Sequence, residues 1–242
     1  MEETPARNAI VGVYRRRNVD CVLRLLEPAL RAQWLTAWWA LDGVDPKLAD
    51  YTIGEGPGEK LLLVNRALAK LPPATWTVIS DDDLVFQDSN VVEFVMICDA
   101  LQLDLAQPAR VRGTQRAHAI VEQRRRSRAR LTSFVECGPL YAVGPRYRDR
   151  ILPLPEQRGM GWGLEIDWFD LHRGGCRLGI IDELPMEHIG VPVADYDYRE
   201  MNQKMKAELV ARGNPRWKGM QETLAVWRPW QADAPWLRDR GY

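Results

Sequence analysis

The sequence is poor in cysteine and lacks long hydrophobic runs, and each absence excludes a class of protein. Its four cysteines are scattered and form no CxxC pair: Cys21, Cys98, Cys137 and Cys176. This scatter argues against a zinc site or a disulfide framework and favours a reducing cytoplasm. No window approaches the roughly 18 apolar residues of a spanning helix, and the N-terminal MEETPARNAI lacks the basic segment of a signal peptide. We therefore expect a cytoplasmic protein without a transmembrane segment.

An excess of either charge is also lacking. Lys and Arg together number 33, as do Asp and Glu, so no global field draws the chain to nucleic acid. The basic run RRRSRAR, residues 124–130, contains no interleaved aromatic residues. We interpret it as a solvated face or a contact for an anionic acceptor, and we expect no nucleic-acid partner.

Short apolar runs alternate with segments of helical spacing in the first half of the chain. Residues 8–13 (NAIVGV) and 75–80 (TWTVIS) predict buried strands, and residues 19–30 carry an apolar helical face between them. The alternation predicts a single α/β domain whose mostly parallel central sheet is flanked by helices. Ligands bind such sheets at the carboxyl ends of the strands.

Three consecutive carboxylates follow the clearest predicted strand: Asp81, Asp82 and Asp83. Adjacent like charges raise one another's pKa, and a hard divalent cation with oxygen ligands relieves that repulsion. Mg²⁺ and Mn²⁺ commonly take one or two carboxylates and complete their shell with substrate phosphates. The alternative is a solvated turn that caps the next helix.

Several short motifs together resemble one family. ISDDDLVF (79–86) looks like the DxD element of GT-A glycosyltransferases, and GEKLLLVN (58–65) resembles the stretch before it. GMGWGLEIDWF (159–169) resembles their glycine-tryptophan-glycine-acidic element. QPAR (107–110) and FVECGPLY (134–141) narrow the match to bacterial and plant GT-A-like proteins long catalogued as a domain of unknown function. The resemblance implies a Rossmann-like GT-A domain that uses a nucleotide sugar.

The resemblance also implies a donor site with a metal. Asp81, Asp83 and His188 (in MEHIG) are the implied ligands of Mn²⁺ or Mg²⁺, although His188 is equally well explained as a histidine that caps a loop. The donor is expected to be a nucleoside-diphosphate sugar, with UDP favoured. The expected donor-binding residues lie near the ends of the first strands or in the motifs: Tyr14, Arg16, Asp42, Lys60, Asn65 and Asp82. For the arginines that follow the first strand, an exposed loop of solvated cations is the alternative.

The glycine-rich motif supplies the candidate catalytic residues. Glu165 matches the acidic position of the family motif and is our candidate base. Asp167 is the second candidate, and the alternative is that it only caps or places a negative charge in the first helical turn. Gly161 and Gly163 permit close backbone approach to a sugar, and Trp162 offers an apolar face for a pyranose ring. Glu136 is a candidate for acceptor hydroxyls, the alternative being a strand glutamate paired with an arginine. The sequence leaves inversion and retention both open.

The sequence therefore predicts a metal-dependent glycosyltransferase acting on a hydroxyl of a glycan, a lipid-linked saccharide or a small molecule. A non-catalytic nucleotide- or carbohydrate-binding protein of the same fold is the alternative. A metal-dependent nucleotidyltransferase or phosphohydrolase is another, but it leaves GMGWGLEIDWF without a role.

The chain is expected to divide by role within one domain. Residues 1–105 form the nucleotide-sugar half, 106–200 the acceptor and catalytic half, and 201–242 a tryptophan-rich extension. That extension contains Trp217, Trp227, Trp230 and Trp236. Core packing is the default for such large aromatic residues, and peripheral membrane contact is left open.

Overall fold

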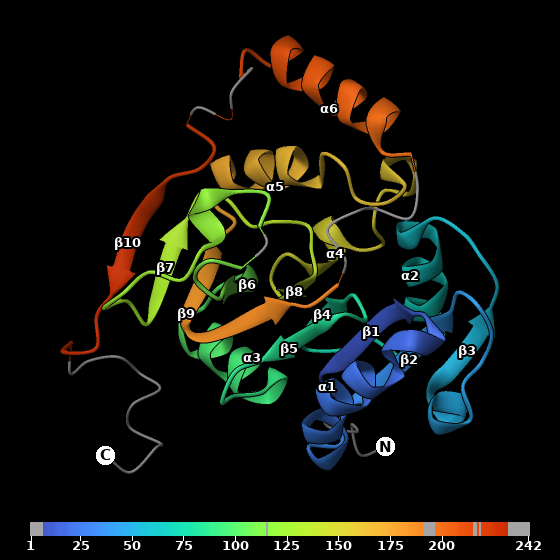
Figure 1. The fold of residues 1–242 in the computed structure, drawn as a ribbon. Helices are drawn as coiled ribbons and strands as arrows, with labels where there is room; N and C mark the ends of the chain where they lie inside the picture. Colours follow the sequence, from blue (N-terminus) through green and yellow to red (C-terminus); the bar gives the residue numbers. More distant parts are fainter. Residues whose placement is uncertain (1–6, 115, 191–196, 215–216, 218, 232–242) are drawn as a thin grey trace, which may run out of the picture.

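The computed structural model describes residues 7–114, 116–190, 197–214, 217 and 219–231. A ten-stranded sheet runs through them (Figure 1), in the order β10-β7-β9-β6-β8-β4-β1-β2-β3, with β5 paired to β9. The strands are β1 Ala9–Tyr14, β2 Leu35–Ala40, β3 Thr52–Glu55, β4 Thr77–Ser80, β5 Leu84–Phe86, β6 Leu105–Arg110, β7 Ala129–Thr132, β8 Leu140–Val143, β9 Leu178–His188 and β10 Thr223–Trp227. The helices are α1 Val19–Arg31, α2 Lys60–Leu68, α3 Val91–Ala100, α4 Arg148–Ile151, α5 Leu164–Arg173 and α6 Arg199–Ala211, with short 3-10 turns at Arg16–Asn18, Pro46–Tyr51, Ala119–Val121 and Glu156–Arg158.

The N-terminal half of the sheet is parallel. β1 pairs in parallel with both β2 and β4, and β2 pairs in parallel with β3. Every residue of β1 is buried, as expected for a parallel strand covered on both faces. Beyond β4 the sheet is mixed, because β8 runs antiparallel between β4 and β6, whereas β6 and β9 are again parallel. The predicted α/β domain with a mostly parallel sheet flanked by helices is confirmed.

Helices cover both faces of the sheet, and β1 shows how its side chains divide between them. Ile10 and Tyr14 pack in a core with residues of α1 and α3. Val11 and Val13 point to the opposite face and pack with residues of α2 and α5. This alternation follows from the two-residue period of a strand. Figure 1 shows α5 on one side of the sheet and α1 with α3 on the other.

The sheet brings several strand ends to one edge. Gly12 is in register with Ser80, and Tyr14 is in register with Ala40, so β1, β2 and β4 end beside one another. β9 reaches the same region through β5, because His188 is the register partner of Leu84. The edge where ligands bind such sheets therefore carries the three aspartates and His188.

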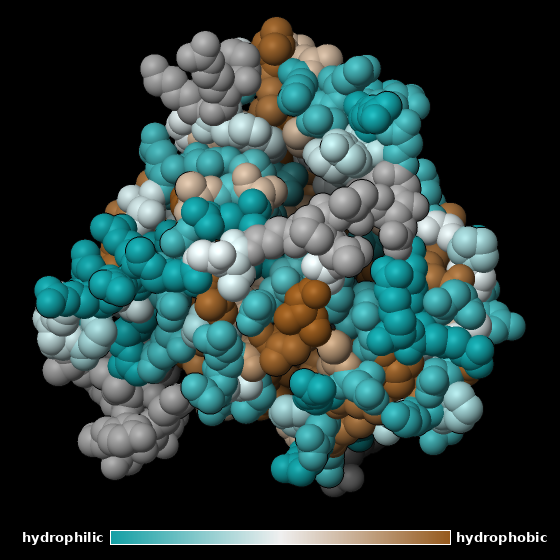
Figure 2. Space-filling model, in the orientation of Figure 1, coloured by the Kyte–Doolittle hydropathy of each residue, from teal (hydrophilic) through white to brown (hydrophobic). Residues whose placement is uncertain are grey.

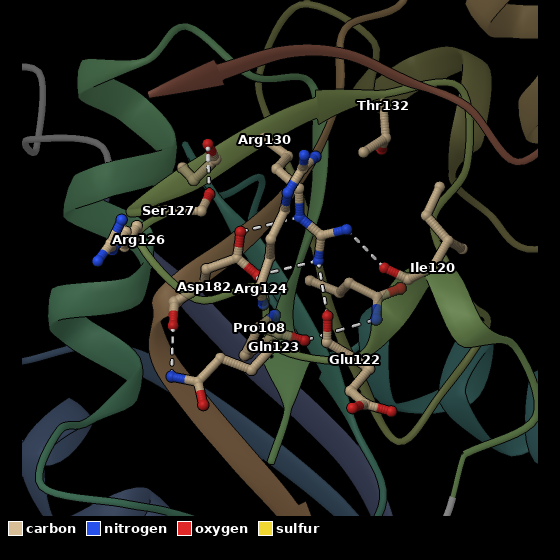
Figure 3. Close-up of polar contacts among 12 residues, drawn as sticks. Pro108, Ile120, Glu122, Gln123, Arg124, Arg126, Ser127, Arg130, Thr132 and Asp182 are labelled. Atoms are coloured by element: carbon tan, nitrogen blue, oxygen red, sulfur yellow. Dashed lines mark hydrogen bonds and ion pairs between the residues drawn. The ribbon is translucent and has the colours of Figure 1, made fainter. Parts of the chain in front are cut away.

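The basic run 124–130 is only partly a solvated face, contrary to its interpretation from sequence. Residues 124–126 are exposed, but Arg128 and Arg130 are buried. Figure 3 shows Arg130 directed at Asp182 of β9, which it binds through Nε and Nη2 at 2.8 and 2.9 Å. We call Arg130, Asp182 and the loop 120–124 around them the β7–β9 corner. Its arginine holds the structure together, so the run is unavailable as a continuous anion-binding face.

The C-terminal extension contributes to the core in part. Trp217 lies edge-on to Phe134 with ring centroids 5.7 Å apart, and the partly buried Trp227 packs against the core that contains residues of α1 and α3. Trp230 is 66% exposed. Trp236 falls outside the described residues. Core packing thus accounts for two of the four tryptophans.

Figure 2 shows a mainly hydrophilic face with apolar residues in small, separate groups. Across the described ranges, no helix is long and apolar enough to cross a membrane.

Candidate functional site

The three aspartates after β4 occupy three different environments. Asp81 forms an ion pair with Lys60, the first residue of α2, with Nζ 2.5 Å from Oδ1. Lys60 is 5% exposed. Burial opposes its charge, but Asp81 outweighs burial and raises the pKa of Lys60. The lysine is thus held as a cation beside the first aspartate.

Asp82 turns instead toward the loop after β1. Its Oδ2 accepts a hydrogen bond from the backbone N–H of Arg15 at 2.6 Å. Burial and the neighbouring aspartates raise the pKa of Asp82 to about 6, although the bonds from Arg15 and Asn18 oppose the shift. The contact joins the ends of β1 and β4.

Asp83 faces His188 across the β5–β9 pairing. Nε2 of His188 lies 2.9 Å from Oδ1 of Asp83, and the two side chains are 23% and 21% exposed. Burial opposes the charge of Asp83, but His188 and Lys60 outweigh it and lower the pKa of Asp83. Gly190 lies against the pair so closely that a Cβ there would fall 1.9 Å from Oδ2. The glycine is therefore required beside this carboxylate.

Asp83 and His188 fit a divalent cation that takes the rest of its shell from a substrate. Oδ1 of Asp83 is buried and meets no described residue with hydrogen-bond geometry, despite its closeness to His188. Within the described ranges no three His, Cys, Asp or Glu side chains converge, and Asp81 is turned to Lys60. The residues present match the habit of Mg²⁺ and Mn²⁺ of using few protein ligands together with phosphate oxygens.

Glu165 lies in the first turn of α5, buried at 9% exposure. Its Oε1 accepts the backbone N–H of Cys137 at 2.9 Å. Burial raises the pKa of Glu165 to about 7, against the lowering effect of that hydrogen bond. A carboxylate with a pKa near neutrality suits a general base.

Asp167 is committed elsewhere. Arg158 binds both of its oxygens at 2.7 and 3.0 Å, and Arg158 also binds Glu208 of α6. The aspartate thus joins the glycine loop to α5 and α6. Of the two acidic residues of the motif, Asp167 is therefore the one bound by an arginine at both oxygens.

The loop 136–138 connects the two carboxylate groups of the site. The N–H of Cys137 binds Glu165, and a Cβ at Gly138 would lie 3.5 Å from Oδ2 of Asp81. Glu136 forms a buried ion pair with Arg110, with Nη2 3.0 Å from Oε2. The pairing that the sequence left as an alternative for Glu136 is therefore present. One loop borders the aspartates, the candidate base and this ion pair.

The glycines of the motif are required by their surroundings. A Cβ at Gly161 would lie 2.4 Å from Sγ of Cys137, and Gly163 has φ +87° at the start of α5. Trp162 stacks on Tyr198, with ring centroids 6.0 Å apart and planes 10° from parallel. Tyr198, 43% exposed, gave no signal in the sequence because it precedes α6, far along the chain from the motif.

Two of the expected donor-binding residues, Tyr14 and Asn65, make hydrogen bonds that support the fold. Tyr14 is fully buried and its hydroxyl lies 2.8 Å from Oγ1 of Thr52, so it braces β3. Asn65 exchanges two hydrogen bonds of 2.8 Å with the backbone of Leu154, which fixes the chain before the glycine motif. Both side chains thus make hydrogen bonds within the protein.

Arg16 and Asp42 remain at the expected edge. Oδ1 of Asp42 accepts the backbone N–H of Arg16 at 2.9 Å, and the exposed Arg16 side chain donates to the carbonyl of Val44. They join the ends of β1 and β2.

A cavity of about 250 Å³ lies at the opposite edge of the sheet. Its lining includes Ala9 and Thr77, which begin β1 and β4, together with Arg148. It is therefore separated from the aspartates by the length of the strands.

Solved structures with a similar fold are glycosyltransferases. TarS 1-349 of S. aureus in complex with UDP has a TM-score of 0.51 and 10% identity over 84% of this chain and 65% of that one. GalNAc-T7 with UDP, GalNAc and Mn²⁺ has a TM-score of 0.56 and 10% identity over 84% of this chain and 47% of that one. Glucosyl-3-phosphoglycerate synthase of Mycobacterium tuberculosis, in complex with Mn²⁺, UDP-glucose and phosphoglyceric acid, has a TM-score of 0.55 and 14% identity. The match covers 93% of this chain and 90% of that one.

These similarities establish the fold. No family model matches the sequence, and no curated protein matches it. The chain spans about two thirds of the TarS fragment and half of GalNAc-T7. The α/β domain therefore has a GT-A-type fold, as the motifs in the sequence implied.

Proposed function

We propose that the chain is a metal-dependent glycosyltransferase that moves a sugar from a UDP-sugar to a hydroxyl of a glycan, lipid-linked or small-molecule acceptor. One observation carries the proposal: on a GT-A-type fold, the loop 136–138 contacts the near-neutral carboxyl Glu165 and lies against Asp81, two residues before the Asp83 that faces His188. Neighbours of this fold bind UDP and Mn²⁺.

In this proposal the donor is held by the first half of the chain, residues 1–105. Asp83 and His188 hold Mn²⁺ or Mg²⁺, which supplies charge compensation for the departing diphosphate. Lys60, kept cationic by Asp81, adds a fixed positive charge at the same edge. Arg16 and Asp42 border the nucleotide from the ends of β1 and β2.

Residues 106–200 then supply the acceptor side. Glu165 removes the proton from the acceptor hydroxyl as that oxygen attacks the anomeric carbon. Trp162, stacked on Tyr198, presents an aromatic face for a sugar ring. Gly161 and Gly163 keep the backbone close to that ring. Residues 201–242 extend the domain.

A binding protein without turnover is the second candidate. The burial of Glu165 against the N–H of Cys137 fits a residue that only supports the loop, as well as a base. Such a protein would bind UDP with metal and remain indifferent to the charge of Glu165.

A thermal-shift panel of UDP, GDP, CDP and ADP, each with and without Mn²⁺, tests the donor site. A ligand at 100 times its Kd adds about 2.7 kcal/mol to the folded state, which is roughly 5–10 °C for a domain of this size. We expect that shift for UDP only with Mn²⁺, and its loss in Asp83→Asn. Asp20→Asn, an exposed aspartate paired with Lys47, is the matched control and keeps the shift.

Hydrolysis of UDP-sugars without an acceptor separates the two candidates. A transferase releases UDP slowly into water, and Glu165→Gln reduces that rate at least tenfold without changing the UDP shift. No turnover in the wild type favours the binding protein. Turnover that is unchanged in Glu165→Gln keeps the transferase and removes Glu165 as its base. Absence of a shift with all four nucleotides contradicts both.

A further inference from the structure

Arg110 and Glu136 form a buried ion pair with an unusual surplus of unpartnered polar atoms. Arg110 uses only Nη2, which donates to Oε2 of Glu136 at 3.0 Å and to the carbonyl of Gly138 at 2.7 Å. Nε and Nη1 of Arg110 and Oε1 of Glu136 are buried, and none has a hydrogen-bond partner among the described residues. Buried polar groups are nearly always paired in native structures, so each exception calls for a physical account.

The pair is held firmly in place. Arg110 ends β6 and is the register partner of Met186 in β9. The backbone N–H of Glu136 donates to Oε1 of Gln107, also in β6. The two side chains are 5% and 9% exposed. The unpartnered atoms therefore do not result from loosely placed side chains.

The place of the pair connects it to the candidate active site. Glu136 is followed directly by Cys137, whose N–H binds Glu165, and by Gly138, which lies against Asp81. Tyr141, at the start of β8, adds a fully buried hydroxyl that also has no partner among the described residues. Unpartnered donors and acceptors thus occur beside the loop 136–138, which contacts the candidate base.

The chemistry of the unpartnered atoms selects a ligand class. Nε and Nη1 of Arg110 only donate, whereas Oε1 of Glu136 only accepts when ionised. A sugar hydroxyl does both, so two neighbouring hydroxyls can satisfy the arginine and the glutamate together. A phosphate or carboxylate offers acceptors alone, and it would meet the negative charge of Glu136.

We propose that Arg110 and Glu136 form a subsite that binds vicinal hydroxyls of a neutral sugar acceptor. The inference rests on the proposed glycosyltransferase function and specifies its acceptor class. It makes Arg110 a specificity-determining residue, although its motif QPAR gave no hint of this role in the sequence.

Saturation-transfer NMR titrations with methyl glycosides test the subsite. The probes are methyl α-D-glucopyranoside, methyl α-D-mannopyranoside and methyl β-D-galactopyranoside, each with UDP and Mg²⁺, and D-glucuronate is the anionic comparison. We expect at least one neutral glycoside to bind the wild type more tightly than glucuronate. Arg110→Lys and Glu136→Gln each weaken that binding at least tenfold.

Arg146→Lys is the matched control. Arg146 makes a bidentate pair with Asp104, beside the opposite end of β6, so this variant tests loss of a guanidinium away from the loop. It is expected to keep the binding curve of the wild type. Thermal melting of all variants identifies any that fail to fold. If one does, Tyr141→Phe, which removes only the unpartnered hydroxyl beside the loop, takes its place in the glycoside titration.

Three results would overturn the subsite. Unchanged glycoside binding in Arg110→Lys and Glu136→Gln removes the residues from recognition. Preference for glucuronate makes the place an anion site. Loss of thermal stability in the variants without any glycoside binding in the wild type indicates that the atoms hold an ordered water. Failure of the proposed function would be seen in a different measurement, because UDP with Mn²⁺ would then not raise the melting temperature of the wild type.

Discussion

Two buried arginine–carboxylate pairs, both in contact with β9, are built in opposite ways. In the β7–β9 corner, Nη1 and Nη2 of Arg130 bind the carbonyls of Ile120 and Glu122, in addition to the two bonds to Asp182. Asp182 also accepts the N–H of Arg124 (Figure 3). Arg110 and Glu136, equally buried, leave three polar atoms without a partner among the described residues.

The difference separates a structural pair from one held ready for a ligand. A buried charge pair stabilises a fold only when further hydrogen bonds satisfy its remaining atoms. The corner meets that condition and fixes the loop 120–124 on the sheet. The Arg110–Glu136 pair does not meet that condition, because three of its polar atoms have no partner among the described residues. Glu165, which contacts the adjacent loop 136–138, has a pKa raised by burial to about 7. Polar groups kept in an unfavourable environment are common at functional sites.

Replacing each charge pair by apolar residues gives the largest expected difference, measured as the change in the free energy of unfolding. Arg130→Met with Asp182→Leu leaves three backbone groups of residues 120–124 without partners, at about 1–3 kcal/mol each. We expect the free energy of unfolding to fall by about 3–9 kcal/mol. Arg110→Met with Glu136→Leu removes three atoms that were already unpartnered and leaves only the carbonyl of Gly138 without its donor, so we expect a smaller fall of about 1–3 kcal/mol.

Urea denaturation of the two double variants measures both values. An unchanged dependence on urea in each variant shows that the native state stays equally compact. Equal losses at the two places would remove the distinction between them.

Glu165 gives the next contrast, as a dependence of stability on pH. Its folded pKa of about 7 lies above the ordinary value of 4.5, so the folded state binds its proton more tightly than the unfolded state. This contribution is complete below the unfolded value and is lost as pH rises through about 7. Glu165→Gln removes the loss. The advantage of the Glu165→Gln variant over the wild type in free energy of unfolding, from this effect alone, therefore rises from under about 1 kcal/mol at pH 5 to about 3 kcal/mol at pH 8.

Chemical denaturation of both proteins at pH 5 and pH 8 measures the difference. Glu183→Gln in β9, whose partner Arg128 lies 2.5 Å away, is a control carboxylate outside the site. The same rise in that control would assign the effect to net charge, and an absent rise in Glu165→Gln would place the Glu165 pKa near its ordinary value.

The sequence was informative where local pattern determines structure. The buried strand before Asp81 and the apolar face of residues 19–30 follow from periodicity, and both occur as β4 and α1. The pairing of His188 with Asp83 requires β9 to pair with β5. That contact joins residues about a hundred positions apart, so the family resemblance supplied it and residue spacing could not.

What the sequence missed has the same physical cause. The hydrogen bonds of Asn65 with Leu154 were not predicted, because the fold brings Leu154 alongside α2 from a distant part of the chain. Arg110 stood in a recognised motif without a role, because its partner Glu136 lies on a separate loop. Whether a polar atom is satisfied depends on such distant contacts, and a linear pattern carries no record of them.

The smallest expected effect distinguishes the two acidic residues of the glycine motif. Asp167 resembles the corner, because Arg158 satisfies both of its oxygens, and its side chain is 35% exposed. Asp167→Asn should therefore lower the free energy of unfolding by less than about 1 kcal/mol, the usual value of a partly exposed ion pair. UDP-sugar hydrolysis should change less than threefold, against at least tenfold for Glu165→Gln. If Asp167→Asn instead reduced hydrolysis at least tenfold and Glu165→Gln less than threefold, the role of base would pass to Asp167.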